Sequence, residues 1–152
     1  MFILCSPHNP VGRVWTREEL EEVGAFLQKN MIFFLFVDEI HGDIVAEGVT
    51  FTTALTLSET VRERLIVATS LTKTFNVPGV IVSYMIVPNE EIRSRIAQTI
   101  DRIGMHNPTI FAVAAVEHGY MECEEWYQQM LDYVNENEKF TREVFCRTFS
   151  GI

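Results

Sequence analysis

Residues 65–79 read LIVATSLTKTFNVPG, and this stretch decides how the rest of the chain is interpreted. Its apolar start, 65–68, has the composition of a buried strand, and the pair Pro78-Gly79 predicts a turn near its end. Between them, four hydroxyl side chains surround a single lysine, Lys73. A lysine at the carboxyl end of a strand can form an imine, and neighbouring hydroxyls can bind an anion. Taken alone, however, this segment is better explained as a solvated loop in which Lys73 has no catalytic role.

Two apolar runs upstream predict further strands. Residues 2–5 form a short run, and residues 31–37 form a longer run without polar alternation. Because residues 31–37 do not alternate, a strand there should be covered on both faces, as in a parallel sheet. Thr16, with Glu19 three residues later, predicts the start of a helix that runs to about Lys29 and connects the two strands.

The downstream sequence predicts one more strand and several helices. Residues 80–87 form a fourth strand, which follows the third too closely for a helical crossover and should be antiparallel to it. Helices are expected over about 58–64, 90–103, 109–121 and 124–145. This order predicts an α/β fold with a mainly parallel sheet of about four strands, the last one antiparallel, flanked by helices.

Composition limits the partners of the chain. The 152 residues carry 12 Lys+Arg against 21 Asp+Glu, and the absence of a basic cluster argues against nucleic-acid binding. The longest apolar run is too short to cross a membrane, and the start of the sequence lacks the features of a signal peptide. The cysteines share no metal or disulfide spacing, so we expect reduced thiols in a cytoplasmic protein. They are Cys5, Cys123 and Cys146.

Polar residues follow each of the three predicted parallel strands. In such sheets, ligands bind outside the carboxyl ends of the strands, so these residues should converge on one ligand. A buried carboxylate needs a cationic partner, an amide can donate to a phenolate oxygen, hydroxyls can bind phosphate and a lysine can form an imine. Pyridoxal 5′-phosphate (PLP) needs this combination of groups. The candidate residues are Asn9, Asp38, His41, Ser70, Thr72 and Lys73.

Other interpretations of these residues stay open. Asp38 can pair with an arginine, and Ser70 can cap a turn without any ligand. A metal site built from Asp38, Glu39 and His41 is disfavoured, because adjacent strand residues face opposite sides and no further His or Cys lies at ligand spacing. We therefore expect no metal.

Three blocks of the sequence resemble fold-type I PLP-dependent enzymes of the class I/II aminotransferase superfamily. They correspond to the N-P-x-G, D-E-x-x and S-x-x-K blocks of that family, in the same order. Asn9 lies 29 residues before Asp38, and Asp38 lies 35 residues before Lys73, which are the usual separations. The blocks are HNPVGR at 8–13, VDEIHGDI at 37–44 and TSLTKTFNVPG at 69–79.

Within that superfamily, the segments DEIH and KTFNVPG are similar to the cystathionine β-lyase-like C–S lyases of the MalY/PatB type. Ordinary aminotransferases usually carry a tyrosine where this chain has His41. Many also carry a phosphate-binding arginine where this chain has Ile81. Both differences favour the lyase branch.

The resemblance implies a role for each candidate residue. Lys73 would hold PLP as an imine and then move the α-proton of the substrate, as the catalytic residue. Asp38 would keep the pyridine nitrogen protonated, and Asn9 would donate to the phenolic oxygen. Ser70 and Thr72 would contact the phosphate. His41 would lie near that oxygen or the edge of the ring.

The resemblance also implies an activity and a domain organisation. The expected reaction is β-elimination from cystathionine- or cysteine-type amino acids to a thiol, pyruvate and ammonia, in a homo-oligomer. The alternatives are an aminotransferase, an inactive fragment, and a non-enzymatic module that binds a phosphorylated ligand. Residues 1–122 would be part of the PLP-binding large domain, and residues 123–152 would form a long helix leading toward a mostly absent small domain.

Overall fold

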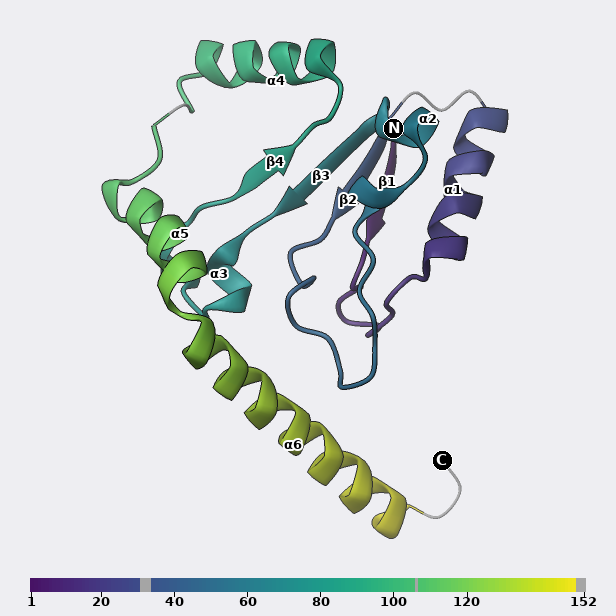
Figure 1. Ribbon diagram of the computed structural model, residues 1–152, viewed down its shortest axis with the longest axis vertical. Helices are drawn as coiled ribbons and strands as arrows, with labels where there is room; N and C mark the ends of the chain where they lie inside the picture. Colours follow the sequence, from purple (N-terminus) through teal and green to yellow (C-terminus); the bar gives the residue numbers. More distant parts are fainter. Residues whose placement is uncertain (31–33, 106, 150–152) are drawn as a thin grey trace.

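A four-stranded sheet lies at the centre of the computed structural model, which describes residues 1–30, 34–105 and 107–149 (Figure 1). The strands run in the order β1-β2-β3-β4 across the sheet. β1, β2 and β3 are parallel, and β4 is antiparallel to β3. The predicted α/β architecture, with its last strand antiparallel, is therefore confirmed. The strands are β1 (Phe2–Cys5), β2 (Leu35–Asp38), β3 (Leu65–Thr69) and β4 (Tyr84–Ile86).

Two strands differ from the predicted bounds. β2 begins at Leu35, and residues 31–33 of the predicted strand lie outside the described residues. β4 is shorter than the predicted 80–87, because a 3₁₀ turn, η2 (Pro78–Val80), precedes it. Ile81 then has a φ of 50°, in the left-handed region, which an extended strand does not contain.

The helices match the expected positions closely. α1 (Arg17–Lys29) begins with the predicted capping box, in which the Thr16 side chain accepts from the Glu19 N–H and the Glu19 carboxylate accepts from the Thr16 N–H. The short α3 (Leu71–Thr74) was not expected, because the sequence indicated a loop around Lys73. The others are η1 (Ala54–Thr56), α2 (Glu59–Arg62), α4 (Glu90–Arg102), α5 (Ile110–Glu122) and α6 (Glu124–Thr148).

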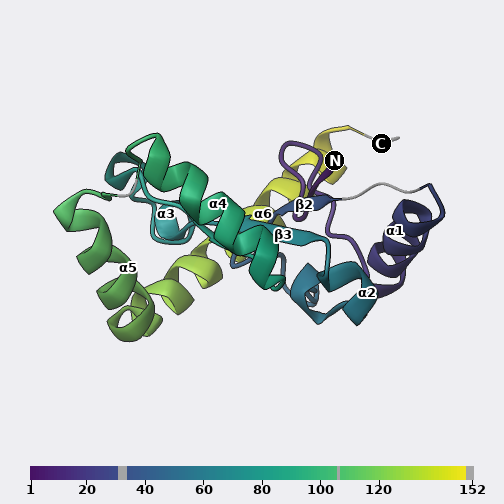
Figure 2. The same cartoon turned by 90° about the horizontal axis from the view of Figure 1, so that it is seen from above.

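One face of the sheet carries the core. The side chains of alternate strand residues on this face pack against α1, η1 and α2, which lie together at one end of the molecule (Figure 2). Each buried aliphatic side chain contributes about 1.5–3 kcal/mol relative to an exposed one. The buried core residues are Leu20, Leu27, Leu35, Val37, Ala54, Leu57, Val61, Leu65 and Val67.

The opposite face of the sheet is largely uncovered. Ile3 of β1 and Met85 of β4 project from this face, with exposed fractions of 64% and 43%. α4 approaches the same face beside Ile66 of β3. An apolar sheet face of this kind normally packs against another layer of structure.

The last two helices lie away from the core. Phe75, directly after α3, packs against aromatic rings of both helices, with ring centroids 5.6 Å from Tyr120 of α5 and 5.9 Å from Trp126 of α6. α6 passes the loop after β2, where Asn135 accepts a hydrogen bond from the Glu47 N–H and Lys139 pairs with the Glu47 carboxylate, and its last turns extend from the body of the molecule (Figure 1). Among the described residues, no helix combines the length and the apolar character needed to cross a membrane.

Candidate functional site

The carboxyl ends of the three parallel strands lie in one row. Strand register places Cys5 beside Asp38, and Asp38 beside Ala68. The pairing continues past the row, because the Ser6 N–H donates to the Asp38 carbonyl and the Glu39 N–H donates to the Ala68 carbonyl, both at 2.9 Å. The segments that carry the predicted site residues therefore leave the sheet at the same edge.

Asp38, the last residue of β2, and Glu39 have different surroundings. Asp38 is half-buried on the face opposite the core, and its carboxylate accepts a 3.0 Å hydrogen bond from the Ile40 N–H. Glu39 is buried, with its carboxylate accepting a 2.7 Å hydrogen bond from the Ala54 N–H, and burial raises its pKa. Glu39 thus anchors the loop before η1, a role that sequence reasoning did not find. Among the described residues, no three His, Cys, Asp or Glu side chains are grouped to hold a metal ion.

Ser70 caps the short helix that carries Lys73. Its hydroxyl accepts a 3.0 Å hydrogen bond from the Thr72 N–H, shares a 2.8 Å hydrogen bond with the Thr72 hydroxyl, and donates to the Val82 carbonyl. This capping explains why the residues around Lys73 form a helical turn rather than a loop. Ser70 and Thr72 are buried, whereas Lys73 is exposed.

Asn9 and His41 lie in the loops that follow β1 and β2. Asn9 is exposed in a turn that is closed by hydrogen bonds from the His8 N–H to the Arg13 carbonyl and from the Gly12 N–H to the His8 carbonyl. His41 is half-buried, and its carbonyl accepts a 2.9 Å hydrogen bond from the Ile44 N–H. Both backbones are therefore fixed by local hydrogen bonds.

Asp43 is a hub of hydrogen bonds that the sequence did not indicate. Its carboxylate accepts from the Thr74 hydroxyl at 2.6 Å and from the Tyr120 hydroxyl at 3.4 Å, and its carbonyl accepts from the Tyr127 hydroxyl at 2.6 Å. Tyr84 also donates to the Tyr120 hydroxyl, at 3.1 Å. Burial raises the pKa of Tyr120, helped by that Tyr84 hydrogen bond and the negative charge of Asp43. The tyrosine therefore stays protonated as a donor.

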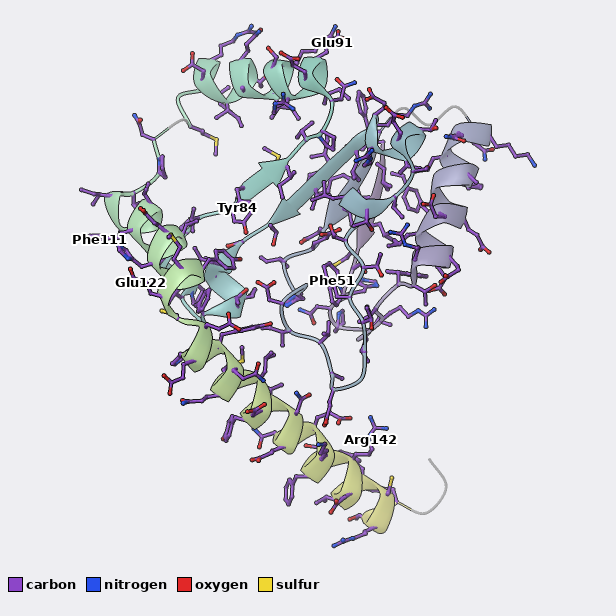
Figure 3. All side chains as sticks on the ribbon, viewed as in Figure 1. Phe51, Tyr84, Glu91, Phe111, Glu122 and Arg142 are labelled. Atoms are coloured by element: carbon purple, nitrogen blue, oxygen red, sulfur yellow. The ribbon has the colours of Figure 1, made fainter. Side chains whose placement is uncertain are left out.

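Two cavities flank Asp43. The larger, about 300 Å³, lies toward the core face of the sheet, and Phe51 and Tyr84 contribute to its wall (Figure 3). The smaller, about 210 Å³, lies between α3, α5 and the start of α6, and is lined by Thr74, Phe75 and Tyr127. Asp43 and Tyr120 line both cavities, so the hydrogen bond between them separates the two spaces.

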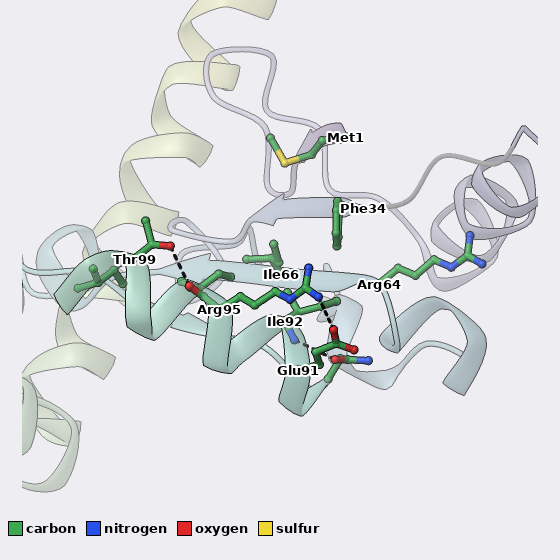
Figure 4. A pocket seen from close by; sticks show the side chains of 11 residues that line it. Met1, Phe34, Arg64, Ile66, Glu91, Ile92, Arg95 and Thr99 are labelled. Atoms are coloured by element: carbon green, nitrogen blue, oxygen red, sulfur yellow. Dashed lines mark hydrogen bonds and ion pairs between the residues drawn. The ribbon is translucent and has the colours of Figure 1, made fainter. Parts of the chain in front are cut away.

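A further recess, about 560 Å³, lies at the other end of the strands, between α4 and the uncovered face of the sheet (Figure 4). Its polar groups are partly paired with each other, as in the 2.6 Å ion pair between Arg95 and Glu91. Because it lies at the amino ends of the parallel strands, it is separate from the candidate site. Its apolar lining comes from Met1, Phe34, Ile66, Ile92, Ile96 and Ile100.

The residues at the carboxyl edge fit PLP in part. Asp38 offers a carboxylate for a ring nitrogen, Lys73 offers an accessible amine for an aldehyde, and Asn9 offers an amide donor. The hydroxyls of Ser70 and Thr72 are already engaged within the chain, so they fit a phosphate only if they exchange partners.

Comparison with known proteins decides the family. Residues 1–150 match the sequence model of the family described as aminotransferase class I and II. The chain belongs to this family. Its members are fold-type I enzymes that use PLP, so the resemblance inferred from the three sequence blocks is confirmed.

Several relatives carry lyase names. Cystathionine beta-lyase PatB of Bacillus subtilis (strain 168) is 32% identical over 137 residues, which cover 90% of this chain and 35% of PatB. Protein MalY of Escherichia coli (strain K12) is 29% identical over 153 residues, which cover 100% of this chain and 38% of MalY. The crystal structure of cystalysin from Treponema denticola, which contains PLP, matches with a TM-score of 0.88 and 32% identity over 94% of this chain and 36% of that chain. The chain thus spans little more than a third of the length of these relatives.

Proposed function

We propose that this chain is the lysine-bearing part of a PLP-dependent C–S β-lyase. The substrate would be a cystathionine- or cysteine-type amino acid, and the products a thiol, pyruvate and ammonia. The observation that carries this proposal is the row formed by Cys5, Asp38 and Ala68, because the loops bearing the candidate residues all begin there. The lyase names of PatB and of its relatives support the choice of reaction.

In this proposal each residue acts through a defined atom. PLP, when bound, supplies a conjugated ring that accepts electrons from the α-carbon of the substrate. Lys73 Nζ holds the cofactor and later moves the α-proton, and the Asp38 carboxylate holds a proton on the ring nitrogen. The Asn9 amide donates to the phenolic oxygen. His41 would lie near the phenolic oxygen or the edge of the ring.

The phosphate contact requires a change of hydrogen bonds. Ser70 and Thr72 donate to the phosphate in this proposal, which means that their mutual 2.8 Å hydrogen bond and the bond from Ser70 to Val82 must open. The N–H groups at the start of α3 remain beside these hydroxyls. Ile81 carries no charge, whereas many aminotransferases have a phosphate-binding arginine at this position. In this proposal the hydroxyls of Ser70 and Thr72 therefore have to bind the phosphate.

The second candidate function is that of an aminotransferase, because the family description covers this reaction. The two activities share the groups that hold PLP and differ in products. A lyase releases a thiol and pyruvate from cystathionine, whereas an aminotransferase needs an added keto acid as amino acceptor. An inactive fragment or a phospholigand-binding module would give neither product.

The proposal is tested by trapping PLP on the protein. The chain has three lysines, so reduction with borohydride followed by peptide mass mapping reports each one separately; they are Lys29, Lys73 and Lys139. We expect a phosphopyridoxyl mass on the Lys73 peptide, absent in Lys73→Ala and unchanged in Lys29→Ala. Thiol release from cystathionine by the same protein with PLP, measured before reduction, supports the lyase. Trapping spread equally over the three lysines would refute a specific PLP site.

We further propose a homo-oligomer in the cytoplasm, without nucleic-acid or membrane partners. β1 and β4 form the two edges of the described sheet, and apolar residues are exposed on one face. Cys5, Cys123 and Cys146 are free thiols, which suits a reducing compartment. We also propose that residues 1–122 belong to the large domain. Residues 123–152, which include α6, would lead toward a small domain.

A further inference from the structure

We propose that Asp43 is a positioning residue that holds the Lys73-bearing helix α3 against the loop that follows Asp38 of β2 and carries His41. This inference rests on the proposed function of Lys73 as the residue that holds PLP. It concerns a residue outside the six candidates, and it is carried by the hydrogen bonds that converge on Asp43 from three other elements.

The first step is the bond between Asp43 and Thr74. The Thr74 hydroxyl donates to the Asp43 carboxylate at 2.6 Å, and it joins residues 31 positions apart in the sequence. Thr74 is buried and directly follows Lys73, while Asp43 lies five residues after Asp38. The bond therefore ties together the two segments whose side chains have to reach the same cofactor.

The second step is the weakness of α3 by itself. It has only four residues, and so short a helix is not stable without outside contacts. Ser70 fixes its start, and the contacts of Thr74 and Phe75 fix its end. Of these, the bond to Asp43 is the one that links α3 to the loop after β2. A hydrogen bond from a hydroxyl to a carboxylate is stronger than one between neutral groups.

The third step is the support behind Asp43. Tyr127 of α6 donates to its carbonyl at 2.6 Å, and Tyr120 of α5 donates to its carboxylate at 3.4 Å. Tyr84 of β4 in turn donates to Tyr120. Hydroxyls from α3, α5 and α6 thus converge on one residue, and they leave the carboxylate little freedom to turn away from Thr74.

Loss of this bond should release Lys73 rather than unfold the chain. Misplacing a reacting group by about 1 Å can lower a rate by about 10²-fold. The core lies between the sheet and α1, η1 and α2, and Asp43 is not one of its residues. A positioning role therefore predicts lost imine formation at Lys73 while the rest of the cofactor site still binds.

The test compares two ligands in the same variants. PLP reports imine formation through borohydride trapping at Lys73, whereas pyridoxine 5′-phosphate has no aldehyde and reports binding alone. We expect Asp43→Ala, which removes the acceptor, and Thr74→Val, which removes the donor, to lower the rate of trapping at Lys73 by at least about tenfold, with the dissociation constant of pyridoxine 5′-phosphate within about twofold of the wild type. Thr74→Ser, which keeps the hydroxyl, should restore trapping. Asp132→Ala on α6 and Thr99→Val on α4 make the matching changes elsewhere and should change neither readout.

The outcomes separate the two proposals. Trapping at Lys73 that is the same in the wild type, Asp43→Ala and Thr74→Val overturns the positioning role and leaves the proposed function standing. If the variants lose PLP trapping and pyridoxine 5′-phosphate binding equally, Asp43 supports the structure of the whole site. This outcome also overturns the proposed positioning role. No trapping at Lys73 in the wild type overturns both proposals.

Discussion

Asp38 and Glu39 are consecutive residues that serve opposite sides of the sheet. Asp38 is half-buried on the uncovered face, whereas Glu39 is buried and accepts a 2.7 Å hydrogen bond from the Ala54 N–H. The two side chains point to opposite faces because successive side chains alternate along an extended strand. One carboxylate is thus available to a ligand, while the other holds the loop before η1.

Glu39 should make stability depend on pH. Burial raises its pKa in the folded protein above the ordinary value of 4.5. A group with a raised folded pKa stabilises the fold most below its unfolded pKa, and this contribution is lost as the pH rises through the folded pKa. We predict that the free energy of unfolding of the wild type, minus that of Glu39→Gln, falls between about pH 4 and about pH 7. Urea unfolding at both pH values measures it, and a rising difference would contradict the raised pKa.

The capping box at the start of α1 should be worth a measurable part of the stability. Thr16→Ala removes the acceptor of the Glu19 N–H, and we predict a loss of about 1 kcal/mol in the free energy of unfolding. Thr141→Ala on the exposed part of α6 removes a hydroxyl of the same kind, which bonds the carbonyl of Asn137, and should change stability by less than half as much. Equal losses in the two variants would show that the box contributes nothing beyond helix propensity.

Much of the fold could be predicted because its signals are local. Apolar runs bounded by turn residues located β1 and β3 to within one residue, and Thr16 with Glu19 located the start of α1. β4 was predicted too long because the conformation of Ile81 and the bond from Ser70 to Val82 depend on how distant segments pack. The role of Asp43 was missed for the same reason, since its tyrosine partners lie 77 and 84 residues away.

Close contact between α1 and α2 gives a packing prediction. A Cβ added at Gly24 of α1 would overlap a methyl group of Val61 in α2, so Gly24→Ala should cost about 1–3 kcal/mol of stability. Adding Val61→Ala should make the double variant lose less than the sum of the two single changes, because the overlap disappears. Gly79→Ala is the matched control, since a Cβ there meets no atom within 4 Å. Strict additivity would mean that the two helices can move apart without cost.

The uncovered sheet face should drive self-association. Ile3, in the edge strand β1, projects from this face with 64% of its surface exposed. We predict that Ile3→Glu shifts the chain toward the monomer in sedimentation velocity, since a buried unpaired charge opposes contact between copies. Val11→Glu places the same charge on an exposed residue outside the sheet and should leave the distribution unchanged. If both variants behave alike, the association depends on net charge rather than on this face.

Substitutions of Asp38 and of Lys73 should affect PLP trapping and thiol release differently. Lys73→Ala removes the amine and should abolish trapping of PLP, whereas Asp38→Asn keeps the shape of the side chain and the acceptor for the Ile40 N–H. Under the proposed function, loss of the carboxylate charge would leave the ring nitrogen without its partner, so we predict a fall of about 10²-fold or more in thiol release from cystathionine. Trapping at Lys73 should fall much less, because imine formation does not require electrons to move into the ring. Equal loss of trapping and thiol release in Asp38→Asn would assign the carboxylate a structural role at the end of β2.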